Sequence, residues 1–589
     1  MKHKLFLTLF FFLMLTTISF GQQPVKKQTG LASNNTANLN KKLDSLFSSF
    51  NNKQSPGFAL TIIKNGKVIT KRDYGMASIE LNVPFSHSTV VRLPYSEGRE
   101  FISIAAAVME QEGLLSLNDK INKYFPKLPQ WSEAVTLQDL LNHSSGFCDE
   151  WATLVLTQAE MANRLDVSQF LDFLYNQPDP QIEPGKGYMY SNSDFGLLRL
   201  ILEKASGKNL SVYMTDKIFT PLGMQQTKLG RNKEEVITNH AFSYAEGDVG
   251  KFTVWMRDKT SPGGNYWILT CANDLEKWAA VHADGNSFIV KAITRLKQQA
   301  RPIPVLKNGT NYVFGHKIKE LVNTVVIKHE GVSGYSFLTQ VPAAGLSIIC
   351  VGNNLDPYAD KTDALVEFLL NGKENKTVAK KLPTQPVAIT KIEIQPYEGT
   401  YRWMNQTSFN GIVERKQFSE LKVIGDSMWL FYSGVDSFPL NYVGNGIFKD
   451  PDYPVWLIMH KPQPDSPMHA TINRQTANND IIEWQKVTAT KKQYSRNELQ
   501  KITGTYYSKH LDFYWRIILN EKGQLVLKRP TIADKIIEPG YDEEFDLPIQ
   551  FHTNDEQHAW IKFYFTQNGE VEYLNVRHGR LMHHRFDKQ

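Results

Sequence analysis

The stretch Leu140-Leu141-Asn142-His143-Ser144-Ser145-Gly146 decides how the first half of this chain is interpreted. It ends the segment Val135–Gly146, in which leucines give way to small polar residues. Three further segments follow it along the chain: Tyr190-Ser191-Asn192, Pro221-Leu222-Gly223-Met224 and His329-Glu330-Gly331. The order of these segments along the chain indicates the fold and function more specifically than any single segment does.

A serine stands upstream, in Ser96-Glu97-Gly98-Arg99. The sequence after it predicts a helix over Ile102–Glu112, because apolar residues recur at helical spacing and Gly113 follows. A serine at a helix start lies near unpaired backbone N–H groups and the positive end of the helix dipole, which suits a nucleophile and its oxyanion. Serine is also a favoured N-cap residue, so this segment alone leaves both roles open.

Taken together, these segments resemble the serine β-lactamase-like family, which includes class C β-lactamases, penicillin-binding DD-peptidases, D-aminopeptidases and related esterases. The resemblance runs from about Asn38 to Asn354, and the two leucine-containing segments are long, specific matches. It implies an α+β fold, in which helices flank an antiparallel sheet and an all-helical insertion carries Tyr190. The expected hydrolase domain spans residues 37–372.

The resemblance also implies roles for individual residues. Ser96 is expected to attack a carbonyl and form an acyl-enzyme, and Tyr190 to take or relay its proton. The backbone N–H groups of Ser96 and Val332 are expected to hold the oxyanion. The expected catalytic residues are Ser96, Arg99 and Tyr190, and the expected substrate-binding residues are Asn192, His329, Gly331 and Val332. The resemblance implies a structural role for His143 in a loop near the site, and neither a metal nor an organic cofactor.

Arg99 departs from the family pattern, which has lysine at this position of the Ser-x-x-Lys motif. An arginine cannot be deprotonated in a protein, so it cannot act as a base or a proton shuttle. It could still favour ionised Tyr190 through its charge. The neighbouring Glu97 and Glu100 are a further concern, because either one could pair with Arg99 and hold it elsewhere.

Two hypotheses therefore remain open. In the first, the chain is an active serine hydrolase of an amide or ester. D-amino-acid peptides or esters are favoured over β-lactams, because His329 stands where lactamases have lysine. In the second, the chain is a catalytically silent relative that binds cell-wall peptide or a protein partner.

The C-terminal part is typical of all-β structure, with aromatic residues in short alternating runs. Pro396–Tyr401 recurs as Lys501–Tyr506, and an apolar run follows each copy roughly 20–25 residues later. We expect a linker at 373–390 and two β-barrel-like domains at 391–490 and 491–589, a single irregular sheet being the alternative. D-aminopeptidases of the family carry two such domains, which supports this expectation.

The N-terminus has the features of a secretory signal at residues 1–21, with Lys2 and Lys4 before an apolar run and small residues before Gln22. Residues 22–36 form a polar lead-in. We therefore expect an exported protein, periplasmic or extracellular and soluble after signal cleavage. No later stretch is long and apolar enough to span a membrane.

The composition of the chain excludes some classes of binding partner and of metal site. Lys+Arg 66 against Asp+Glu 60 gives a net charge of only +6 without a sustained basic block, so nucleic acid is not expected. The three cysteines form no CxxC pair, which argues against a disulfide framework and a cysteine zinc site and predicts buried thiols. The expected partner is a small-molecule or peptide substrate. The sequence does not indicate an oligomeric state.

Overall fold

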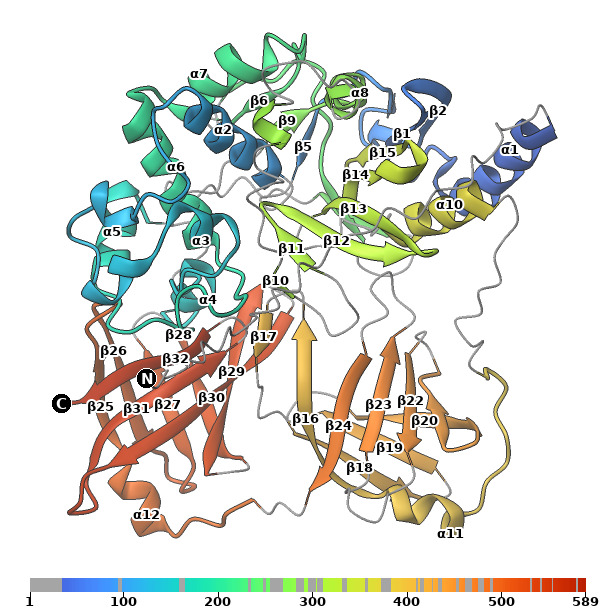
Figure 1. Ribbon diagram of the computed structural model, residues 1–589. Coiled ribbons are helices and arrows are strands. Elements are labelled where there is room, and N and C mark those ends of the chain that lie inside the picture. Colours follow the sequence, from blue (N-terminus) through green and yellow to red (C-terminus); the bar gives the residue numbers. More distant parts are fainter. Residues whose placement is uncertain are drawn as a thin grey trace, which may run out of the picture. The chain divides into compact units, whose positions relative to one another are not determined.

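The structure is a computed structural model of the whole chain (Figure 1). The residues that it describes are 34–93, 98–157, 165–230, 235–246, 251–254, 268–281, 291–294, 303–304, 311–330, 336–354, 359–371, 383–408, 411–413, 418–425, 427–432, 437–451, 455–460, 469–474, 481–487, 491–529, 532–540, 543–552, 555–578 and 581–589. The expected signal at 1–21, most of the lead-in at 22–36 and most of the linker at 373–390 lie outside these ranges. So do Ser96, Glu97, Gly331 and Val332.

The chain divides into two compact units, Met1–Ser48 and Ser49–Gln589. Helix α1 covers Asn34–Phe47 in the first unit, and the 3-10 turn at Ser48–Phe50 begins at the last residue of that unit. Among the described residues, none of the helices combines the length and the apolar character needed to cross a bilayer.

An eight-stranded antiparallel sheet forms the centre of the mixed α and β part of the second unit, in the order β10-β11-β12-β13-β14-β15-β1-β2. The strands are β1 (Phe58–Lys64), β2 (Lys67–Tyr74), β10 (Ile303–Pro304), β11 (Asn311–Val313), β12 (His316–Leu321), β13 (Thr324–Glu330), β14 (Ser336–Val341) and β15 (Leu346–Gly352). The apolar strand β1 is buried along almost its whole length. At the β1–β2 turn, Asn65 (φ 50°) and Gly66 (φ 73°) adopt the left-handed backbone that a two-residue hairpin turn requires.

Helices and short strands surround this sheet. The helices are α2 (Arg99–Gln111), α3 (Leu137–Leu141), α4 (Glu150–Leu154), α5 (Val167–Tyr175), α6 (Asn192–Ser206), α7 (Leu210–Met214), α8 (Ala272–Val281) and α10 (Ala359–Asn371), with 3-10 turns at Ile121–Lys123, Gln130–Ala134 and Pro342–Ala344 and a π turn at Thr215–Phe219. The short strands are β3 (Met76–Ser78), β4 (Val83–Pro84), β5 (Val91–Leu93), β6 (Lys228–Leu229), β7 (Tyr244–Glu246), β8 (Phe252–Val254) and β9 (Ile268–Thr270).

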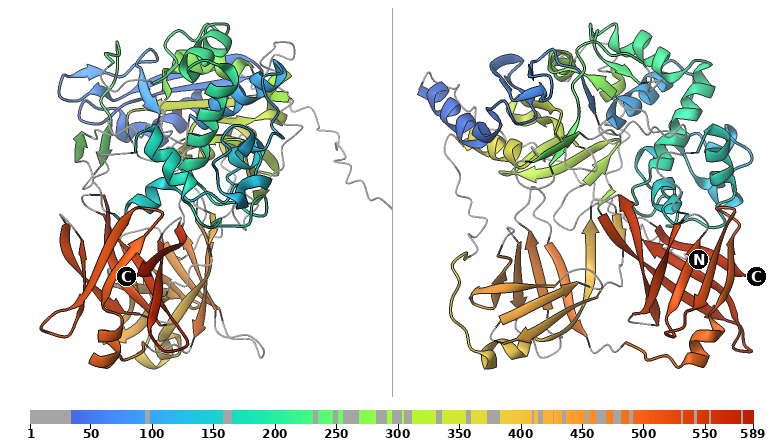
Figure 2. Two further views of the ribbon diagram at one scale, coloured as in Figure 1. Left: turned by 90° about the vertical axis from the view of Figure 1, so that its left-hand side faces the viewer. Right: turned by 180° about the vertical axis from the view of Figure 1, so that it is seen from behind.

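Helix α2 is the central helix of this part, since every residue from Arg99 to Glu110 is buried. A helix that is buried on all sides has no solvent face, so both its apolar and its charged side chains must find partners inside the protein. Helices α3, α4, α5 and α6 gather into one helical group, which agrees with the expected helical insertion (Figures 1 and 2). The arrangement is the expected α+β one, an antiparallel sheet flanked by helices. Cys148, Cys271 and Cys350 are free and buried, as predicted.

The C-terminal part contains two β-sheet systems. The first has the order β17-β16-β18-β19-β20-β21-β22-β23-β24, and β16 pairs with β24 as well as β18, so the sheet returns to its own first strands. The second is a closed barrel of β25 to β32. The first system comprises β16 (Gly399–Ser408), β17 (Gly411–Val413), β18 (Phe418–Ile424), β19 (Ser427–Tyr432), β20 (Ser437–Gly444), β21 (Ile447–Lys449), β22 (Val455–His460), β23 (His469–Arg474) and β24 (Ile481–Val487), preceded by α11 (Lys391–Ile394) and a 3-10 turn at Gln395–Tyr397.

The barrel comprises β25 (Gly504–Ser508), β26 (Phe513–Leu519), β27 (Leu525–Arg529), β28 (Ile532–Pro539), β29 (Glu544–His552), β30 (Asp555–Phe565), β31 (Val571–His578) and β32 (Leu581–Lys588), preceded by α12 (Arg496–Lys501). The sequence repeat has the same structural role in both systems. Gly399 (φ 150°) and Gly504 (φ 153°) open the first strands. The tyrosine two residues later donates its hydroxyl to a backbone carbonyl four residues upstream, at 2.7 Å in both copies. The two systems are therefore built on one repeated local structure.

We predict that Gly504→Ala destabilises the barrel by about 1–3 kcal/mol, because φ of 153° is unfavourable for a residue with a side chain. The added Cβ would also lie 2.9 Å from Cε of Lys588. The measurement is urea unfolding followed by tryptophan fluorescence. Gly187→Ala is the control, since its Cβ meets its nearest neighbour at an ordinary 3.8 Å. Equal losses of stability in the two variants would contradict the prediction.

Candidate active site

The site is built around Arg99, the first residue of α2, which is 2% exposed. Its guanidinium donates from one terminal nitrogen to Nε2 of His143 at 3.0 Å and from the other to Oδ1 of Asn192 at 2.8 Å. The guanidinium carbon also lies 4.2 Å from the ring centre of Tyr190 and 4.8 Å from that of Phe195. Arg99 therefore binds the His143 loop and the start of α6 at once.

Asn192 is the first residue of α6, and Asp149 fixes its orientation. The Asp149 carboxylate accepts from the Asn192 side-chain amide at 3.0 Å and from its backbone N–H at 2.9 Å. The side-chain oxygen of Asn192 is thereby turned toward Arg99. Tyr190 donates its hydroxyl to the same oxygen at 3.3 Å. Asp149 also caps α4 by accepting from the backbone N–H of Ala152 at 3.0 Å, so one carboxylate joins two helices.

His143 connects Arg99 to a buried carboxylate. Because a guanidinium can only donate, Nε2 of His143 must be the acceptor, and a neutral ring then carries its proton on Nδ1. That nitrogen lies 3.0 Å from Oδ2 of Asp194 and can donate to it, while the amide of Ser191 makes a longer contact of 3.3 Å with the same nitrogen. Burial raises the pKa of Asp194 well above its ordinary value, against the opposing effects of a Ser145 hydrogen bond and the Arg99 charge.

Aromatic rings complete the surroundings of Arg99. Tyr312 lies with its ring centre 5.2 Å from those of His143 and Tyr188. Burial acts to lower the pKa of Arg99, but the nearby Tyr190, Tyr312 and Tyr188 act in the opposite direction, and the net pKa is above the ordinary value. Arg99 is therefore a permanent buried cation, held by hydrogen bonds and by the faces of aromatic rings.

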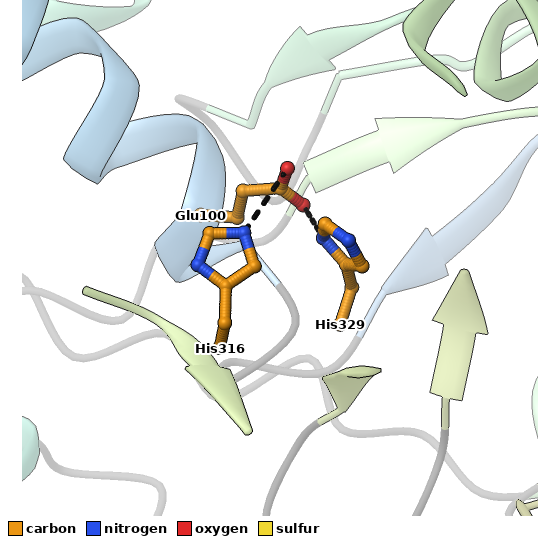
Figure 3. Close-up of side chains that lie close together, drawn as sticks. All are labelled: Glu100, His316 and His329. Carbon is orange, nitrogen blue, oxygen red and sulfur yellow. Dashed lines mark hydrogen bonds and ion pairs between the residues drawn. The ribbon is translucent and has the colours of Figure 1, made fainter. Parts of the chain in front are cut away.

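The third motif residue, His329 on β13, lies against Glu100, the residue after Arg99 (Figure 3). Its Nδ1 contacts one carboxylate oxygen of Glu100, and its Nε2 lies 3.3 Å from Oε1 of Gln340. The other carboxylate oxygen accepts from the Trp278 indole at 3.0 Å and lies 3.4 Å from Nε2 of His316. Glu100 therefore makes these contacts in place of the pairing with Arg99 that its position in the sequence suggested.

The structure thus brings Arg99, Tyr190 and Asn192 into direct contact. It links His329 to them through the first turn of α2. Ser96, Gly331 and Val332 lie outside the described residues, so their roles stay predictions. Among the described residues, Glu100, His316 and His329 offer possible metal-ligand atoms within 4.8 Å of one another.

Sequence reasoning missed Asp149, Asp194 and His316 as parts of the site, and it considered Glu100 only as a residue that could pair with Arg99. Asp194 follows the Tyr-x-Asn motif by two residues, so its position near the motif was a usable signal. Asp149 precedes a helix and is a common N-cap residue, so the sequence indicates only a local role for it. Its contact with Asn192 could not be predicted from that pattern. Nothing in the sequence spacing joins Glu100 to His316.

We predict that Asp149→Ala costs about 1–3 kcal/mol more in unfolding free energy than Asp166→Ala, because it also leaves the buried Asn192 amide without its acceptor. Asp166 is the matched control, since it also caps a helix by accepting from the backbone N–H three residues later, and its contacts are exposed. Denaturant unfolding of the two variants measures the difference. Equal losses would show that Asp149 acts only as a helix cap.

Comparison with known proteins identifies the relatives of this fold. The family model described as Beta-lactamase matches residues 43–370, more than half of the chain. Penicillin-binding protein 4* of Bacillus subtilis (strain 168) is 29% identical over 212 residues, which cover 35% of this chain and 46% of that protein. Protein flp of Staphylococcus aureus (strain MRSA252) is 25% identical over 346 residues, covering 56% of this chain and 65% of that protein. The chain therefore matches about half to two thirds of the length of these relatives.

A solved structure has the same fold. The octameric penicillin-binding protein homologue from Pyrococcus abyssi superposes with a TM-score of 0.52 at 19% sequence identity, covering 84% of this chain and 98% of that one. The match of the family model agrees with the motif order along the chain and with the antiparallel sheet flanked by helices. The chain belongs to the Beta-lactamase family.

Proposed function

We propose that the protein is an exported serine hydrolase that cleaves an amide or an ester through an acyl-enzyme on Ser96. The observation that carries this proposal is the position of Arg99, three residues after Ser96, in contact with both Tyr190 and Asn192. The favoured substrates are small D-amino-acid peptides or esters, because His329 takes the place of the lysine of β-lactamases in the third motif. The N-terminal sequence supports export to the periplasm or the cell exterior.

The proposed reaction has two halves. In the first, the Ser96 hydroxyl oxygen bonds to the substrate carbonyl carbon and its proton passes to Tyr190. Tyr190 then gives this proton to the leaving amine or alcohol as the scissile bond breaks. In the second half, water attacks the acyl carbon, Tyr190 takes a proton from the water and returns it to the Ser96 oxygen, and the carboxylic acid leaves.

Arg99 has an electrostatic role in this proposal. Its positive charge beside Tyr190 favours the phenolate form that accepts a proton, and Arg99 itself releases none. The hydrogen bonds to His143 and Asn192 fix the guanidinium in place, so no reorientation is needed when charge develops on the tyrosine oxygen. A buried, fixed cation of this kind replaces one function of the family lysine, the stabilisation of charge, and leaves proton transfer to Tyr190.

The second candidate is a catalytically silent relative that binds cell-wall peptide or a protein partner. One observation favours it. Asn192, which is expected to orient the substrate, already accepts from both Arg99 and Tyr190 through its side-chain oxygen. A substrate that needs this oxygen has to displace one of these donors, and the loss of the family lysine removes the usual proton shuttle.

A covalent probe separates the two candidates. Purified protein is exposed to a fluorophosphonate or a penicillin and its intact mass is recorded beside that of Ser96→Ala. We expect one added probe mass on the wild type and none on the variant, because Ser96 is the proposed nucleophile. Equal labelling of both proteins would contradict the nucleophile assignment. A wild type that stays unlabelled by either probe would support the silent relative.

We predict that Arg99→Lys lowers kcat/KM at least tenfold toward an amide or ester that the wild type hydrolyses, equivalent to about 1.4 kcal/mol of transition-state stabilisation. An ammonium group is a point charge and cannot reproduce the planar, two-ended contact with His143 and Asn192. Arg199→Lys is the control, since Arg199 is another buried arginine, paired with Glu203 on α6. A higher kcat/KM in Arg99→Lys would instead show that the arginine impairs turnover.

A further inference from the structure

We propose that Glu100, His316 and His329 form a binding site for one divalent transition-metal ion, with Zn²⁺ the best match to the ligand set. The three side chains converge from three elements, α2, β12 and β13 (Figure 3). Their possible ligand atoms all lie within 4.8 Å of one another. Two imidazole nitrogens with one carboxylate oxygen are a donor set that suits zinc and other first-row transition metals.

The fold brings His316 to Glu100 through a tight turn. Phe314 (φ 48°) and Gly315 (φ 89°) form the turn between β11 and β12, and His316 is the first residue of β12. A Cβ on Gly315 would lie 2.8 Å from the backbone nitrogen of Glu100. Only glycine permits this approach of the turn to the first turn of α2, so residue 315 sets the distance between the histidine and the carboxylate.

The protonation of His316 leaves a lone pair directed at Glu100. Its Nδ1 lies 3.2 Å from the carbonyl oxygen of Val313 and 3.1 Å from that of Phe314. Carbonyl oxygens only accept, so Nδ1 carries the proton and Nε2 of the neutral ring has a lone pair. This Nε2 is 3.4 Å from a carboxylate oxygen of Glu100. A lone pair and a carboxylate oxygen repel each other unless a cation or a further proton lies between them.

Each of the three side chains also has an outer partner that fixes its orientation. The two backbone carbonyls hold His316, the side-chain oxygen of Gln340 lies 3.3 Å from Nε2 of His329, and the indole of Trp278 donates to Glu100 at 3.0 Å. Metal-ligating histidines and carboxylates in proteins are oriented by such outer hydrogen bonds. If the two histidines served only to pair with the buried carboxylate, hydrogen bonds on the opposite ring nitrogen of each would not be needed.

The dimensions are compatible with an ion. Bonds of about 2.0–2.2 Å at tetrahedral angles place two ligand atoms about 3.3–3.6 Å apart. The separation of His316 Nε2 and Glu100 Oε1 is 3.4 Å. His329 and Glu100 are in closer contact, so this pair has to open slightly as the ion binds. Glu100 and His329 are buried while the side chain of His316 is 14% exposed, so the ion reaches the site from the His316 side.

This inference goes beyond the proposed function and does not depend on the chemistry of Ser96. The two share His329, which the proposed function assigns to substrate orientation. For that reason the experiment measures metal binding and not hydrolysis, and Ser96→Ala is expected to bind the ion like the wild type. Failure of the nucleophile assignment and failure of the metal site are then separate results.

The test titrates chelator-treated, untagged protein with Zn²⁺ by isothermal calorimetry. We expect one equivalent to bind, and Glu100→Gln and His316→Asn to weaken the affinity at least 100-fold, since each removes a ligand. His460→Asn is the control, because His460 is exposed and lies on β22. Gln340→Leu removes only an outer partner and is expected to weaken binding 10–100-fold.

Two further measurements guard against variants that fail to fold. Zn²⁺ is expected to raise the melting temperature of the wild type and of His460→Asn, but not that of His316→Asn. Bound Co²⁺ is expected to give d–d absorption bands in the wild type that are lost in Glu100→Gln. The proposal is overturned if the wild type binds no stoichiometric Zn²⁺, or if His316→Asn and Glu100→Gln bind it as tightly as the wild type.

Discussion

The burial of the Arg99 charge is the constraint on which the arrangement of the site depends. Removing a guanidinium from water is expensive unless hydrogen bonds and nearby charges or ring faces replace its hydration. Here His143 and Asn192 accept hydrogen bonds from it and Tyr190 presents its ring face. The two hydrogen-bond acceptors lie 44 and 93 residues away in the sequence. One buried cation therefore holds together the start of α2, the Leu140–Gly146 stretch and the start of α6.

The partners of Arg99 are themselves held by carboxylates, and this extends the constraint into the helical group. Asp149 fixes the amide of Asn192 and caps α4, while Asp194 accepts from His143 and from the hydroxyl of Ser145. Each of these groups is buried, so each missing hydrogen bond would leave an unsatisfied polar atom. His143 and Ser145 of the Leu140–Gly146 stretch are thus explained by the chain of hydrogen bonds that begins at Arg99.

Sequence patterns correctly predicted the parts of the fold that depend on interactions between residues close together in the sequence. The helix expected over Ile102–Glu112, which forms as Arg99–Gln111, and the repeated Gly-Thr-Tyr starts of β16 and β25 all depend on residues a few positions apart. The motif order also located Arg99, Tyr190 and Asn192, which the structure joins. The contact of Glu100 with His329 was not predictable in this way, because 229 residues separate them and α2 is buried on every side. In such a helix no polar face marks where a charged side chain points. A register shift between His329 and Glu330 also interrupts the alternation of side chains along β13, so the sequence pattern does not predict which of them face α2.

Arg99 and Glu100 are adjacent in sequence, yet their side chains serve different neighbours. Successive residues of an α-helix point about 100° apart, so the first turn of α2 can present a cation to one set of elements and an anion to another. Arg99 meets residues of the helical group, His143 and Asn192, whereas Glu100 meets His316 and His329 on the sheet strands β12 and β13. The Glu100 carboxylate is directed at the two imidazoles and the Trp278 indole, whereas the guanidinium donates hydrogen bonds to His143 and Asn192. The guanidinium is thus directed at Tyr190, His143 and Asn192, and the first turn of α2 keeps this cation apart from the anion beside it in the sequence.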